Sequence, residues 1–151
     1  MMLVEFLPSS EKKNQFLEYI ISDFSFITQN TTSEFFSSLL INDINIAFDA
    51  DGVAFSIFGT SPFSRWQSGD FLVPQANSGS LIFRGKFTPG ISYRVNPIDK
   101  YWKVIFNKKN GWLEIKDFYI NCEFVKIFDG AIIGINCGNI TGLWLRPHMI
   151  E

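Results

Sequence analysis

The sequence predicts an α+β fold, with one or two N-terminal helices followed by about eight mostly antiparallel strands in a curled sheet or a partly closed barrel. Apolar residues recur at helical spacing as far as residue 41 and alternate with polar residues after it. Short turn signals separate the alternating runs, as is typical of antiparallel sheets. We therefore expect a single domain over residues 1–151, helical at about 9–41 and strand-rich at about 42–147.

The predicted helices rest on capping residues and apolar stripes. Ser9 follows Pro8 and can cap the first helix, because its hydroxyl can accept a hydrogen bond from an amide of the first turn. A second, shorter helix is expected at Ser33–Leu40, because Thr31 and Glu34 have capping-box spacing. The apolar face of the first helix would consist of Phe16, Leu17, Tyr19, Ile20, Ile21 and Phe24.

The strands are predicted from alternation and from turns. Residues 44–48 and 53–57 alternate around Asp49-Ala50-Asp51-Gly52, which predicts a hairpin. Residues 59–80 read as a loop with a short strand at Asp70–Val73. The alternation slips at Asp117-Phe118, which predicts a bulge or a corner. The remaining predicted strands are Leu81–Phe87, Ile91–Val95, Tyr101–Phe106, Trp112–Asp117, Phe118–Phe128, Ala131–Cys137 and Leu143–Arg146.

Composition and charge exclude several classes of protein. The formal net charge is −2, whereas a general nucleic-acid binder needs a basic surface, so we expect no nucleic-acid partner. No apolar run is long enough to span a bilayer, and the first ten residues lack the basic start of a signal peptide. Two cysteines, Cys122 and Cys137, form no metal or redox motif. We expect a cytoplasmic protein without cofactor or metal, monomeric when unbound.

No catalytic motif is present, so we expect no enzyme and no catalytic residues. The lone histidine, His148, lies three residues from the end and cannot anchor a catalytic triad by itself. The Asp49-Ala50-Asp51-Gly52 segment resembles part of a calcium loop, but its glycine comes too early and Thr60 occupies the twelfth position, where a bidentate Glu is needed. Glycine-rich phosphate loops and nucleophile elbows are missing as well.

The loop from Pro62 to Gln75 is the first candidate for partner binding. Trp and Arg are enriched at the energetic hot spots of interfaces, and both occur side by side in this loop. The alternative is that the tryptophan folds back and closes one end of the sheet. The candidate residues of the loop are Phe63, Arg65, Trp66, Asp70 and Phe71.

Three acidic residues, Asp43, Asp49 and Asp51, are a second candidate, because they could complement a basic partner. The alternative is a solvated turn without a binding role.

The chain resembles bacterial immunity proteins of polymorphic and contact-dependent growth inhibition toxins. The resemblance is carried by Trp112-Leu-Glu-Ile-Lys-Asp-Phe, by the turn at Asp129-Gly130, and by the closing run Gly142-Leu-Trp-Leu-Arg. It implies a protein that neutralises a cognate toxin domain by stoichiometric binding. The alternative function is a small-molecule binder, in which the 17 phenylalanines would line an apolar cavity in the curled sheet. An enzyme of unrecognised type is the third hypothesis.

Overall fold

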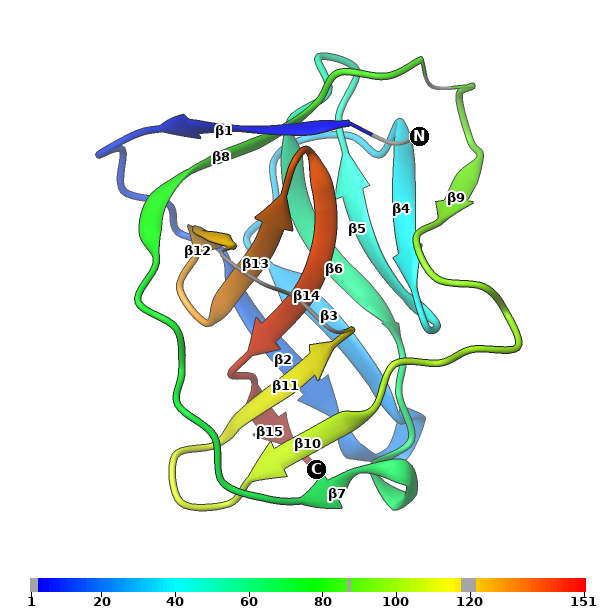
Figure 1. Ribbon diagram of the computed structural model, residues 1–151, viewed down its shortest axis with the longest axis vertical. Helices are drawn as coiled ribbons and strands as arrows, with labels where there is room; N and C mark the ends of the chain where they lie inside the picture. The colour runs from blue at the N-terminus through cyan, green and yellow to red at the C-terminus, as the bar shows by residue number, and fades with distance from the viewer. Residues whose placement is uncertain (1–2, 87, 118–121) are drawn as a thin grey trace.

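The computed structural model describes residues 3–86, 88–117 and 122–151, and the regular secondary structure of this part of the chain is almost entirely β-strand, arranged in two sheets (Figure 1). Its only helical segments in those ranges are two short 3₁₀ turns, η1 (Ile21–Asp23) and η2 (Phe63–Arg65). The predicted α+β class with N-terminal helices is therefore wrong, and the fold is nearly all β.

The larger sheet has eight strands and most neighbouring pairs are antiparallel; β7 with β10 and β8 with β12 are the parallel exceptions. Its order is β1 (Val4–Pro8), β8 (Asn77–Phe83), β12 (Glu123–Phe128), β13 (Ala131–Asn136), β14 (Asn139–Leu145), β11 (Trp112–Lys116), β10 (Val104–Asn107) and β7 (Gln67–Ser68).

The smaller sheet has seven strands, with parallel pairs at both edges, where β15 lies beside β2 and β9 beside β4. Its order is β15 (His148–Ile150), β2 (Phe16–Ile20), β3 (Ser25–Gln29), β6 (Ala54–Thr60), β5 (Ile44–Phe48), β4 (Ser37–Ile41) and β9 (Ser92–Arg94). Neither sheet closes on itself, so the prediction of a curled sheet or a partly closed barrel is also wrong.

Alternate residues of the two sheets form one hydrophobic core. Leu17 and Tyr19 of β2 enter it from the smaller sheet, and Leu113 and Ile115 of β11 enter it from the larger one. Each of these side chains is at most 1% exposed, as expected for sheets that bury one face and expose the other. Because the core is continuous, the two sheets hold the ends of their strands in fixed relation.

The predicted first helix is replaced by a hairpin of β2 and β3. Along β2, buried Leu17 and Tyr19 alternate with half-buried neighbours, which is a period of two and not of 3.6. The connection runs through η1 and ends at Phe24, whose φ of 52° is left-handed. No glycine or proline marks this turn, so the sequence lacked the usual signal for a break between strands.

The predicted second helix at Ser33–Leu40 is also wrong. Its second half belongs to β4, which pairs with β5 from Ser37↔Phe48 to Ile41↔Ile44. The strand is fixed by its neighbours on both sides, because Ser38 Oγ donates to Asn45 Oδ1 on β5 and lies 2.6 Å from Ser92 Oγ on β9. These cross-strand contacts stabilise the strand more than the capping box at Thr31 and Glu34 would stabilise a short helix.

Several predicted strands are confirmed. The hairpin around Asp49–Gly52 is formed by β5 and β6, and the Asp129-Gly130 turn joins β12 to β13. The short strand expected at Asp70–Val73 is not formed. Residues 118–121 and Phe87 lie outside the described residues, and so does the predicted irregularity at Asp117-Phe118. Both cysteines are free thiols, Cys122 lying 3.2 Å from Thr141 Oγ1.

Candidate functional site

A cleft of about 480 Å³ lies where the ends of the two sheets meet, and the strands that line it are found at the bottom of Figure 1, near the C-terminus. The smaller sheet contributes β2, η1 and β15, and the larger sheet contributes β7 and β10. The turn η2, between β6 and β7, closes it on one side. Its apolar lining consists of Tyr19, Ile21, Phe63, Trp66, Phe106 and Met149, and its polar lining consists of Ser68 and Lys108.

Trp66 is the central side chain of this apolar cleft. Its ring centroid lies 4.8 Å from that of Tyr19 and 5.4 Å from that of Phe106, so it joins the two sheets. Its indole Nε1 donates to Ser61 Oγ at 3.0 Å, and the Tyr19 hydroxyl donates to the Ser61 carbonyl oxygen at 2.6 Å. Burial of Tyr19 raises the pKa of its phenol. Trp66 thus folds back and closes the end of the structure, as the alternative interpretation of the loop predicted.

Phe63, which lines this cleft, and Phe24, which contacts Phe63, are both exposed. Phe63 is 46% exposed and Phe24 is 43% exposed, and their ring centroids lie 5.6 Å apart. Arg65 follows on the same turn and is exposed too. The sequence missed Phe24 because the predicted helix placed it on a buried face. Only the left-handed turn after η1 brings it next to Phe63.

The other side of η2 borders a depression of about 320 Å³, whose lining includes the polar residues Asp43, Arg65 and Tyr101. Tyr101 donates its hydroxyl to Asp43 Oδ2 at 2.5 Å, and Arg94 Nη2 lies 3.6 Å from Asp43 Oδ1. The hydrogen bond to Asp43 raises the pKa of Tyr101. The carboxylate of Asp43 is therefore already engaged by a phenol and a guanidinium.

The structure does not bring the three acidic candidates together. Asp43 precedes β5, whereas Asp49 and Asp51 follow it, so five strand residues separate them. Asp49 Oδ1 accepts the amides of Asp51 and Val53, each at 3.0 Å, which makes Asp49 a turn-forming residue. Asp43 and the Asp49–Asp51 turn therefore do not form one acidic patch.

The loop candidates Asp70 and Phe71 lie just beyond β7, and Asp70 pairs with Lys109 at 3.5 Å.

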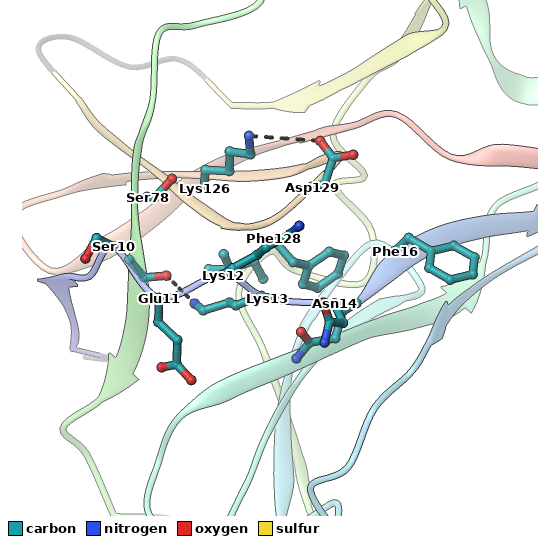
Figure 2. Close-up of a pocket in the computed structure, with 13 residues that line it drawn as sticks. Ser10, Glu11, Lys12, Lys13, Asn14, Phe16, Ser78, Lys126, Phe128 and Asp129 are labelled. Carbon is teal, nitrogen blue, oxygen red and sulfur yellow. Dashed lines mark hydrogen bonds and ion pairs between the residues drawn. The ribbon is translucent and has the colours of Figure 1, made fainter.

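A second large cleft, of about 580 Å³, is lined mainly by charged and polar groups of residues 10–16 and the end of β12 (Figure 2). Lys13 Nζ donates to the carbonyl oxygen of Gly79 at 2.5 Å, and burial lowers the pKa of Lys13. Lys126 lies 3.9 Å from Asp129, which Arg146 also contacts at 3.5 Å. This mixed cleft has much of its charge balanced internally and contains none of the residues predicted from the sequence.

Other chemistry is sparse in the described part of the chain. His148 is exposed on β15, with its ring edge-on to Phe16 at 5.7 Å. Within residues 3–86, 88–117 and 122–151, no three Asp, Glu, His or Cys side chains cluster in a way that would hold a metal ion. None of the helical segments described there has the length and hydrophobicity needed to cross a bilayer.

Comparison with models of known protein families gives no match, and comparison with curated protein sequences gives none either.

Proposed function

We propose that this chain is a binding protein that neutralises a cognate toxin domain through the surface around η2, in the manner of a bacterial immunity protein. The observation that carries the proposal is the pairing of exposed Phe63 with exposed Phe24, beside Arg65 and above a tightly held Trp66. We call these four residues the η2 surface. Stoichiometric occlusion of a toxin needs no catalytic group on the inhibitor.

The composition and rigidity of the η2 surface support binding. Aromatic residues and arginine are enriched in interface hot spots, and an anchor that is already ordered loses little entropy on association. Trp66 is held by Ser61 and by two neighbouring rings, so the turn that displays Phe63 and Arg65 is supported from below. Adjacent exposed apolar side chains, as opposed to single ones, are typical of surfaces that bind a partner.

The test is co-expression with the C-terminal toxin domain encoded by the neighbouring gene, with growth rescue and complex formation as readouts. Phe63→Ala together with Arg65→Ala should weaken binding by about thirtyfold or more, which corresponds to about 2 kcal/mol or more. Phe35→Ala is the matched control, because Phe35 is also 46% exposed but lies near Asp49, away from η2. If the chain rescues growth equally well with both substitutions at η2, or rescues no neighbouring toxin, the proposal is wrong.

A second candidate function, small-molecule binding, is favoured by the apolar cleft. Its volume of about 480 Å³ falls in the range of roughly 300–1,000 Å³ that is usual for ligand pockets. The cleft is not a cavity inside a curled sheet, as the sequence led us to expect, but an opening between the ends of two sheets. Binding of an apolar dye that is displaced by small ligands would test this function separately from toxin neutralisation.

A further inference from the structure

We infer that the apolar cleft binds a medium-chain carboxylate, with its alkyl chain along Tyr19, Trp66 and Phe106 and its carboxylate at Lys108. This inference rests on the second candidate function and names its ligand class. The apolar cleft shares Phe63 and Trp66 with the η2 surface, whereas Lys108 belongs to the cleft alone.

The wall of the cleft is more apolar than its residue types suggest. Tyr19 and Trp66 each carry a polar atom, but both of those atoms hydrogen-bond to Ser61. A ligand that covers these rings therefore leaves no hydroxyl or indole N–H without a partner. Phe106, Trp66 and Ile21 also pack directly against the hydrophobic core, which keeps the wall in place before a ligand arrives. Such a surface suits an extended hydrocarbon chain.

The charge of the cleft has one sign. Lys108 is its sole charged lining residue in the described part of the chain, and none of the described carboxylates lies within ion-pair distance of the Lys108 ammonium. The next residue, Lys109, differs because it pairs with Asp70 at 3.5 Å. One unbalanced ammonium at the mouth of an apolar cleft is complementary to a ligand with one negative charge and an apolar body. A neutral or cationic amphiphile would leave that ammonium unpaired or repel it.

The order of the lining residues sets the orientation of the ligand, and the volume of about 480 Å³ leaves room for a medium-length alkyl chain. The apolar residues run from Met149 and Tyr19 on the smaller sheet across Trp66 to Phe106 on the larger one, and Lys108 follows Phe106 by two residues. A chain laid across Trp66 and Phe106 therefore brings its polar end close to Lys108. Ser68 on β7, which also lines the cleft, is a hydroxyl donor near the same end.

The experiment is titration of the full chain with decanoate, followed by calorimetry and by the NMR signal of the Trp66 indole N–H, which is assigned by its loss in Trp66→Phe. Decanol and decyltrimethylammonium are the neutral and cationic probes of the same chain length. We expect decanoate to bind more tightly than both and to shift the Trp66 signal. Lys108→Met should weaken decanoate about two- to fivefold and leave decanol unchanged, since a solvent-accessible ion pair contributes modestly. Lys109→Met is the matched control and should change decanoate affinity less than the Lys108 substitution does.

Three results would overturn the inference. Equal affinity for decanoate, decanol and the cation would show that Lys108 selects no charge, although small-molecule binding itself would stand. Decanoate binding that leaves the Trp66 signal unmoved would place the ligand outside the cleft. Absence of binding by all three probes would also overturn the inference, while the dye test of small-molecule binding and the co-expression test of the η2 surface would stand on their own results.

Discussion

Replacing Trp144 by phenylalanine tests whether a buried carboxylate on the outer face of the larger sheet is stabilised by an indole. Trp144 on β14 is fully buried and lies opposite Glu114 on β11. Its Nε1 donates to Glu114 Oε2 at 3.0 Å, and the Glu114 side chain is only 6% exposed. Lys116 Nζ lies 3.7 Å from the other carboxylate oxygen. The substitution removes the donor and part of the ring while the carboxylate remains buried.

The expected cost has two parts. A hydrogen bond to a charged group contributes about 1.5–3 kcal/mol, and the lost ring volume adds about 1 kcal/mol because the space is only partly refilled. Chemical denaturation should therefore show Trp144→Phe to be less stable by about 2.5–4 kcal/mol. Trp112→Phe on the same face should cost less than 1 kcal/mol, because Trp112 is half-exposed and contacts Arg146 through a cation–π interaction.

A double-mutant cycle with Glu114→Ala separates the hydrogen bond from the lost packing. If the bond stabilises the fold, the double variant should be less destabilised than the sum of the single variants, by about 1.5–3 kcal/mol. A coupling energy below about 0.5 kcal/mol would refute the reasoning, since it would mean that the indole and the carboxylate act independently.

Three further predictions follow from local geometry. Gly134→Ala should lower stability by about 1–3 kcal/mol in thermal unfolding, because its Cβ would lie 2.9 Å from Trp144 Cζ3; an unchanged midpoint would contradict this packing. Asp49→Ala should lower the free energy of unfolding in urea by about 1–2 kcal/mol, because Asp49 accepts hydrogen bonds from two turn amides. Asp51→Ala should lower it by less than about 0.5 kcal/mol, because Asp51 is exposed. Equal losses for the two variants would contradict the turn-forming role of Asp49. The raised pKa of Tyr19 contributes stability that is present below pH 10 and is lost as pH rises through the folded-state pKa, so unfolding free energies measured between pH 8 and 11 should fall less steeply in Tyr19→Phe than in the wild type.

The elements that could be predicted from the sequence are those whose turns carry a chemical signature. The hairpin at Asp49–Gly52 was recognisable because an aspartate that caps its own turn and a glycine with φ of 80° stand between two alternating runs. The β2–β3 hairpin was not, because its left-handed residue is Phe24 and its apolar residues also fit a helical stripe. The segment is rich in aromatic and β-branched residues, which favour a strand, whereas the capping signal at Ser9 favours a helix.

Only the part of the candidate site that lies on η2 could be predicted from the sequence. Phe63, Arg65 and Trp66 are adjacent in the chain, so their residue types were enough to single them out. Phe24 comes from the turn after η1, and Phe106 and Lys108 come from the end of β10, so their proximity to η2 depends on how the ends of the two sheets meet. That arrangement is set by strand order and register, which local alternation does not determine.

The same end of the molecule carries two candidate binding sites, the η2 surface and the apolar cleft, and Ser61 and Lys108 have different roles in them. Ser61 satisfies the polar atoms of Tyr19 and Trp66, so these rings act as a rigid apolar support for the exposed Phe63 and, on their other side, as the wall of a cleft. A protein partner that contacts the η2 surface binds a turn that Trp66 holds in place, and this contact does not require Lys108. A small carboxylate gains from the wall and does not need Phe24 or Arg65. Substitutions at Lys108 and at Arg65 therefore act on different proposals, whereas Phe63 and Trp66 belong to both the η2 surface and the lining of the cleft.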